Sequence, residues 1–154
     1  MNFLKIFLIF FLVNFFLSSC AKKEKTSLIV EEDVEQQMIR AFKEGYDEFR
    51  EGDALFAAKK FNEAELLFPQ SSWAPKAALM AAYVYYAQDY YFDAESELNR
   101  FIKTYPKNPD LNYAHFLLAM CYYEKIVDEK KDLGPLLQAQ EKFNFIVKNY
   151  PETD

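Results

Sequence analysis

The feature that most constrains the fold of this chain is an internal repeat. Three segments end in an aromatic residue followed by proline, and twelve residues before each proline lies an alanine. Four residues after each alanine comes a large apolar residue, and the next position is asparagine in all three segments. The aligned residues are Ala57, Phe61, Asn62 and Phe68-Pro69; Ala94, Leu98, Asn99 and Tyr105-Pro106; and Ala139, Phe143, Asn144 and Tyr150-Pro151. Self-similarity of this kind predicts stacked copies of one small structural unit.

A small residue before each alanine completes the pattern. Gly45 and Ala82 lie twelve residues before the first two alanines, whereas Ala119 lies twenty before the third, which places an insertion of eight residues around 128–135. Small residues let two helices approach closely, proline ends the second helix, and each segment has helical apolar periodicity. We therefore expect three antiparallel helix pairs: 36–51 with 53–68, 74–88 with 90–105, and 110–127 with 135–150.

This pattern resembles the tetratricopeptide repeat, in which each unit is a pair of antiparallel helices. The predicted fold class is all-α, a solenoid of three helix pairs. The folded domain is expected over residues 37–154, with repeats at about 37–69, 74–106 and 110–151.

The first twenty residues predict an export signal rather than a part of the fold. Lys5 is followed by an apolar run that is shorter than a membrane-spanning helix requires. The run ends in Leu17-Ser18-Ser19-Cys20, which resembles the box of a bacterial lipoprotein. We therefore expect residues 1–19 to be a signal peptide, Cys20 to carry the lipid, and residues 20–36 to form a polar tether. An ordinary signal peptide with an incidental cysteine, or an uncleaved anchor, is the alternative.

Composition argues against several classes of function. The net charge is −6 and there is no long basic block, so we expect no binding of nucleic acid through its phosphates. The three glycines lie far apart, whereas phosphate-binding loops need clustered glycines. His115, Cys20 and Cys121 do not have the spacing of metal ligands, so we expect no metal and no cofactor. We expect His115 to be a core or partly buried residue and Cys121 to be an inert buried thiol, and we expect no enzymatic activity.

A second apolar stripe on the first helix of each pair marks a candidate binding face. Residues three before, one after and four after the small position share one side of the helix. They are Phe42, Tyr46 and Phe49 in the first repeat; Leu79, Tyr83 and Tyr86 in the second; and Phe116, Met120 and Tyr123 in the third. One interpretation is a groove that binds an extended peptide through apolar anchors. The alternatives are packing against the next repeat or a neighbouring subunit, and a self-contact between copies.

The order of features along the whole chain resembles the BamD family, also called ComL or YfiO, the lipoproteins of the β-barrel assembly machinery. The resemblance is carried by Leu17–Cys20, Phe68-Pro69 with Trp73-Ala74, Arg100-Phe101-Ile102 with Tyr105-Pro106, Pro109 with Tyr113-Ala114, Tyr122-Tyr123-Glu124, and the insertion before Ala139. It implies a scaffold lipoprotein of the BAM complex, anchored to the periplasmic face of the outer membrane. It also implies that BamA and other BAM subunits are partners, and that the groove receives C-terminal segments of unfolded outer-membrane proteins.

The sequence departs from the family pattern in two places. Family members carry five repeats, whereas three precede Asp154 here, so the resemblance is to a truncated member. Where family members often have Arg-Asp-Gln in the insertion, this chain has Lys131-Asp132-Leu133. The alternative function is that of another periplasmic repeat lipoprotein, an adaptor of the cell wall or of the Tol-Pal machinery. Co-purification with BamA, rather than with peptidoglycan enzymes or Pal, distinguishes the two.

Overall fold

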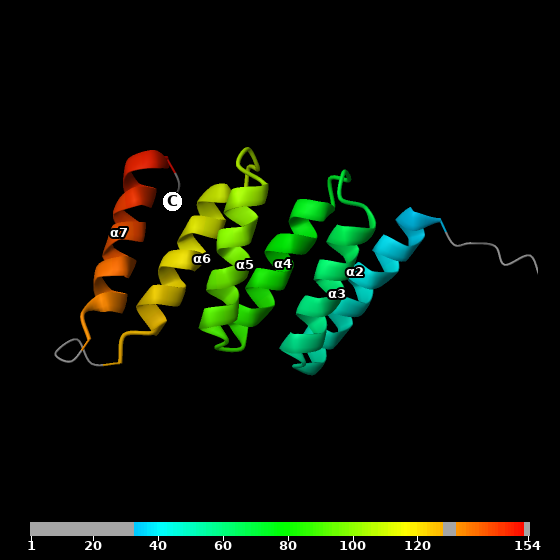
Figure 1. Ribbon diagram of the computed structural model, residues 1–154, viewed down its shortest axis with the longest axis horizontal. Coiled ribbons are helices and arrows are strands. Elements are labelled where there is room, and N and C mark those ends of the chain that lie inside the picture. Colours follow the sequence, from blue (N-terminus) through cyan, green and yellow to red (C-terminus); the bar gives the residue numbers. More distant parts are fainter. Residues whose placement is uncertain (1–32, 128–131, 153–154) are drawn as a thin grey trace, which may run out of the picture. The chain divides into compact units, whose positions relative to one another are not determined.

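The computed structural model describes residues 33–127 and 132–152, and this part of the chain contains six α-helices and no strand. The helices stand side by side in chain order, each antiparallel to the one before it (Figure 1). Their bounds are α2 Val34–Glu51, α3 Ala54–Leu67, α4 Ala74–Ala87, α5 Tyr91–Thr104, α6 Leu111–Glu124 and α7 Gly134–Asn149. The expected all-α fold with three helix pairs is therefore confirmed.

The second helix of every pair ends in the same way. The residue after the last helical turn is aromatic and has an extended φ of −140°, −120° or −132°, and the proline follows it. These three residues are Phe68, Tyr105 and Tyr150. Because the ring of a proline disfavours helical backbone in the residue before it, each aromatic-proline pair stops the second helix at the same place in its repeat.

Small residues lie where the two helices of a pair cross. Ala57 and Ala94 are completely buried, and Ala139 is 3% exposed. Gly45 faces this contact in the first repeat, where a Cβ atom would lie 3.1 Å from the carbonyl oxygen of Ala57 and 3.1 Å from the ring of Phe61. A methyl group at Gly45 would therefore be tightly packed, and its neighbours would have to shift by a few tenths of an ångström to admit it.

The helix pairs stack on one another through buried apolar side chains. α3 packs on α4 and α5 packs on α6, and α4 also contacts α6 directly. One apolar cluster joins the second repeat to the third, and its larger members are Leu98, Phe101, Leu117, Leu118 and Tyr122. The contact between α4 and α6 brings the first helices of two repeats onto one face of the stack.

A buried carboxylate ties the first repeat to the second. The side chain of Glu65 on α3 is 7% exposed, and its two oxygens accept from Nη1 and Nη2 of Arg100 on α5, at 2.9 and 2.8 Å. The hydroxyl of Tyr105 donates to Glu65 at 2.6 Å, while Nε and Nη2 of Arg100 also donate to Glu97 and Asn62. These hydrogen bonds compensate for the loss of hydration of Glu65, and they raise the pKa of Arg100.

Two of the expected helix boundaries were wrong by more than one residue. α2 begins at Val34, so residues 34–36, which we assigned to the tether, are helical. Asp33 and Glu35 belong to the start of this helix, where carboxylates interact favourably with the positive end of the helix dipole. α6 ends at Glu124 instead of residue 127, and the ammonium group of the next residue, Lys125, binds Glu95 on α5.

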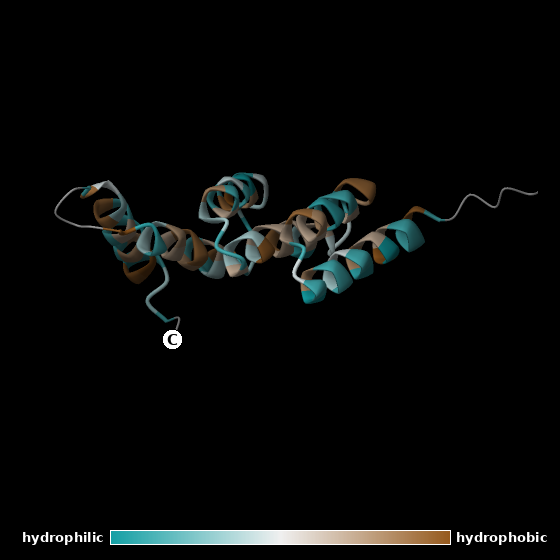
Figure 2. Cartoon of the chain, turned by 90° about the horizontal axis from the view of Figure 1, so that it is seen from below, coloured by the Kyte–Doolittle hydropathy of each residue, from teal (hydrophilic) through white to brown (hydrophobic). Residues whose placement is uncertain are grey.

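The first helix is the most hydrophilic of the stack. α2, next to the grey trace in Figure 2, is mostly teal, and it buries Met38, Ala41 and Gly45. α4 buries six residues, five of them alanine. None of the helices in residues 33–127 and 132–152 is long and apolar enough to cross a membrane. The expected signal peptide, the lipidation site at Cys20 and the tether up to residue 32 lie outside the described residues.

Candidate functional site

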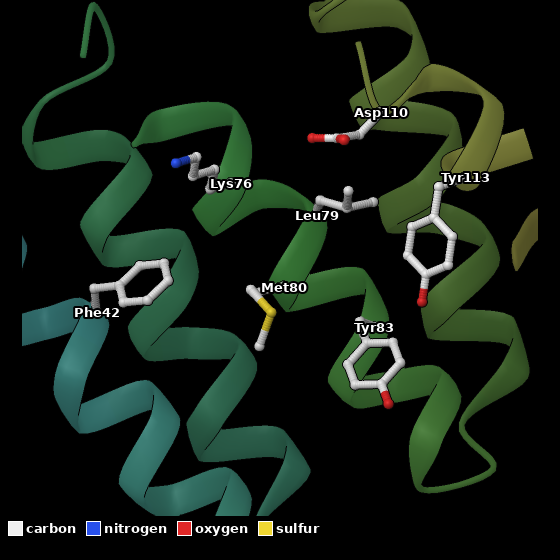
Figure 3. Close-up of a pocket in the computed structure, with 7 residues that line it drawn as sticks. All are labelled: Phe42, Lys76, Leu79, Met80, Tyr83, Asp110 and Tyr113. Carbon is white, nitrogen blue, oxygen red and sulfur yellow. The ribbon is translucent and has the colours of Figure 1, made fainter. Parts of the chain in front are cut away.

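An apolar pocket of about 470 Å³ lies across the first helices of the repeats. Its lining residues are Phe42 of α2, Lys76, Leu79, Met80 and Tyr83 of α4, Asp110 immediately before α6, and Tyr113 of α6 (Figure 3). The volume is within the range of pockets that hold small ligands or side chains. Because three different helices contribute, the pocket exists only when the repeats are stacked.

Aromatic packing holds the walls of the pocket in place. The ring of Phe42 packs edge-to-face against Phe61 at 5.1 Å and against Trp73 at 5.3 Å, measured between ring centroids. The ring of Tyr83 packs in the same manner against Phe49 at 5.9 Å. Rings that are already ordered lose little conformational entropy when a ligand binds, so this surface is suited to binding.

The structure brings three of the nine predicted groove residues into this pocket, namely Phe42, Leu79 and Tyr83. The other six lie on the first helices but do not line it. Phe49, Tyr86 and Met120 are half-buried, with Phe49 against Tyr83 and Tyr86 against Tyr91. Tyr46, Phe116 and Tyr123 are exposed. Within the stripe, Phe49 therefore packs against the next repeat and Tyr86 against the second helix of its own repeat, while three residues form part of the pocket wall.

Four lining residues were missed by the sequence reasoning: Lys76, Met80, Asp110 and Tyr113. Lys76 and Tyr113 occupy equivalent positions, six residues before the small residues Ala82 and Ala119. They extend the predicted stripe by one turn towards the start of each first helix. A stripe continued in this direction would have found both residues, because the helical spacing carries on without interruption.

Two further hollows adjoin the same helices. One of about 260 Å³ is lined by Met38, Ile39, Phe42, Lys43 and Trp73, so it shares Phe42 with the main pocket. The other, of about 340 Å³, lies between α6 and α7 and contains Tyr123 of the predicted groove. Its remaining lining residues are Leu136, Leu137, Ala139, Gln140 and Phe143.

His115 and Cys121 do not belong to the pocket. His115 is half-buried against Phe145, with 4.7 Å between ring centroids, and burial followed by the charge of Lys142 lowers its pKa below 6.5. Cys121 is fully buried and free, and burial raises the pKa of its thiol to about 12. His115 is thus partly buried and Cys121 fully buried, as expected. Among the described residues no group of His, Cys, Asp and Glu is arranged to hold a metal ion.

The pocket and the helix stack together define a class of protein, a helical-repeat protein with an apolar pocket on its first helices. The family model described as an outer membrane lipoprotein, YfiO, matches residues 34–154. That match covers all six helices of the stack, so the chain belongs to the YfiO family of outer membrane lipoproteins.

Individual relatives agree with this assignment. The chain is 34% identical over 137 residues to the outer membrane protein assembly factor BamD of Caulobacter vibrioides. The matched region covers 89% of this chain and 44% of that protein. It is 31% identical over 112 residues to BamD of Rickettsia prowazekii, covering 68% and 45%. For BamD of Neisseria meningitidis the identity is 26% over 109 residues, covering 71% and 41%. The matched region thus spans less than half the length of each of these relatives.

Proposed function

We propose that this chain is a non-enzymatic adaptor in the assembly of outer-membrane β-barrel proteins. In this role the groove on the first helices binds C-terminal segments of unfolded barrel proteins. The observation that carries the proposal is the apolar pocket, whose ordered aromatic walls come from α2, α4 and α6. The names of the relatives, outer membrane protein assembly factors, supply the process in which such a groove acts.

The chemistry of the pocket fits an extended apolar segment better than a reactant. Its walls are Phe42, Leu79, Met80, Tyr83 and Tyr113. Burial raises the pKa of Tyr113 above 10.0, so its hydroxyl remains protonated at neutral pH. Such side chains provide apolar contact area and phenolic donors for a peptide backbone, and the two charged lining residues, Lys76 and Asp110, can pair with the polar groups of that backbone.

The proposal includes an anchor and partners. Cys20 carries a lipid that holds the chain at the periplasmic face of the outer membrane, and the barrel subunit BamA and other BAM subunits bind the helix stack. The mass of the native protein extracted from membranes tests the anchor, because Cys20→Ala should remove the lipid. Purified BamA mixed with the full chain tests the partner, and no complex in that mixture would remove BamA from the proposal.

Peptide binding to the full chain tests the groove itself. Tyr83→Ala should weaken binding of a peptide from the C-terminus of a barrel protein by about 1–3 kcal/mol, the effect of truncating an interface anchor. Phe92→Ala is the matched control, because Phe92 is an aromatic residue of α5 that is 77% exposed and lies outside the pocket. The groove assignment would be contradicted if both variants lost the same peptide affinity, or if neither lost any.

A further inference from the structure

The main pocket has an apolar body and two charged residues. Lys76 of α4 and Asp110 at the start of α6 are the only charged residues among those that line it. Figure 3 shows both in the upper part of the view, with Leu79 below Asp110 and the ring of Tyr83 in the lower part. A ligand in this pocket therefore meets a cation and an anion as well as apolar side chains.

Lys76 is one of several lysines in the described residues whose ammonium group has no carboxylate partner there, and it is the one that lines the main pocket. Lys60, Lys125 and Lys142 each bind a glutamate. Lys76 has no such carboxylate partner within the described part of the chain, and its Nζ lies 4.9 Å from the centroid of the Trp73 ring. A cation held beside an aromatic face at the rim of an apolar pocket is available to an incoming anion.

The repeat shows that this charge is not needed for folding. The residues equivalent to Lys76 are Ile39 in the first repeat and Tyr113 in the third, so the same helical position accepts apolar or aromatic side chains. The chain as a whole carries a net charge of −6. The lysine at this position is exposed beside the pocket, so its charge is open to contact with a ligand.

We propose that Lys76 determines specificity for a free C-terminus: it binds the terminal carboxylate of the segment held in the groove. The last side chain of that segment enters the apolar pocket beside Phe42, Met80 and Tyr83. This inference rests on the proposed peptide-binding function and adds the direction in which the peptide lies and the group that is recognised.

Asp110 favours a peptide end over other anions. The last residue of a peptide carries a carboxylate and a backbone N–H, so it can offer an anion to Lys76 and a donor to Asp110 at the same time. A lipid phosphate has no N–H donor, and Asp110 would repel its negative charge. Asp110 is free for this role because its side chain makes no capping hydrogen bond to α6.

A pair of synthetic peptides tests the proposal with the full chain. Both end in phenylalanine, one as the free acid and the other as the C-terminal N,N-dimethylamide, which removes the charge and adds no N–H donor. The free acid should bind about tenfold more tightly, as expected for a charge-assisted hydrogen bond, and added salt should reduce the difference. Lys76→Gln should lower the affinity for the free acid to that for the amide.

Two further variants make the test specific. Lys103→Gln, an exposed lysine in the last turn of α5, is the matched control and should keep the tenfold preference. Asp110→Ala should weaken the acid and the amide to the same degree, because both peptides keep the N–H donor. Lys76 is exposed, so its replacement does not threaten the fold.

The outcomes separate this inference from the function on which it rests. Equal binding of acid and amide to the unmodified chain would overturn the role of Lys76 and leave the groove intact. A preference for the acid that persists in Lys76→Gln would overturn it as well. Failure of both peptides to bind would instead contradict the proposed function.

Discussion

The middle and the end of the helix stack differ in how much of each helix is buried. α4 buries six residues and has packed helices on both sides, whereas α7 buries only Ala139 among the described residues. Leu137 and Val147 of α7 are 58% and 73% exposed. α5, the second helix equivalent to α7, has packed helices on both sides and buries Ala94, Leu98 and Phe101, so part of the difference comes from the neighbours.

This comparison shows what the repeat pattern determines and what stacking adds. Small residues and the terminal proline give each unit the same backbone, but a repeat becomes stable by burying apolar surface against units on both sides. The pocket lies on the well-buried part of the stack, between α2, α4 and α6. Its geometry therefore depends on the most strongly packed helices and very little on α7.

The largest expected effect comes from equivalent large residues in the first and third repeats. Phe61 is fully buried, whereas Phe143 is only half-buried. Phe61→Ala should lower the free energy of unfolding by about 3–5 kcal/mol, because it leaves a cavity in a closed core. Phe143→Ala should cost about 1 kcal/mol, because solvent already reaches that site. Urea unfolding of the two variants measures the difference, and equal losses would contradict the comparison.

A smaller effect is expected from the ion pair between the first two repeats. Arg100→Ala leaves the buried carboxylate of Glu65 without its bidentate partner and should cost about 2–3 kcal/mol. The control is Lys142→Ala, since the pair of Lys142 with Glu141 at 3.4 Å is on the surface of α7 and should contribute less than about 0.5 kcal/mol. Thermal unfolding monitored by circular dichroism measures both variants. Similar losses of stability in the two variants would mean that the burial of Glu65 does not make its ion pair stronger than a surface pair.

The smallest expected effect is a pH dependence of the contact between α6 and α7. His115, the only histidine in the sequence, has a pKa below 6.5 in the folded state because it is partly buried. Between the folded and the unfolded pKa, the unfolded chain binds a proton that the folded chain does not, so stability falls as the pH falls through this window. Urea unfolding at several pH values should show this loss in the unmodified chain.

His115→Gln is the control for that measurement. Glutamine does not titrate, so the loss between neutral and mildly acidic pH should disappear in this variant. The pKa of Glu95 is lowered from its ordinary value of 4.5 in the folded state. Protonation of Glu95 therefore reduces the stability of the fold only below pH 4.5, whereas the loss caused by His115 begins at higher pH. An unchanged pH dependence in His115→Gln would assign the effect to another group.

Most of the fold could be predicted from the sequence because its signals are local. The spacing of small residues to Ala57, Ala94 and Ala139 fixed the pairing of helices, and the aromatic-proline pairs fixed where the second helices end. The start of α2 at Val34 was not found, because a run of acidic residues is equally compatible with a tether and with the first turn of a helix.

The site was harder to predict because it depends on how separate helices meet. The stripe located Phe42, Leu79 and Tyr83, but helical spacing alone does not tell at which turn neighbouring helices leave a hollow. Lys76 and Asp110 lie 34 positions apart in the sequence and are brought to one pocket only by the stacking of α4 on α6. The pairing of Glu65 with Arg100 was missed for the same reason, since many glutamates and basic residues could have paired.

The central claim is that a peptide binds along the first helices, and amide chemical-shift mapping tests it most directly. The full chain, labelled with nitrogen-15, is titrated with a peptide that ends in phenylalanine as the free acid. The largest shifts should fall on α4 around Leu79, Met80 and Tyr83, and on α2 around Phe42. If the largest shifts fall instead on α3, α5 and α7 while these amides stay unchanged, the groove is not the binding site.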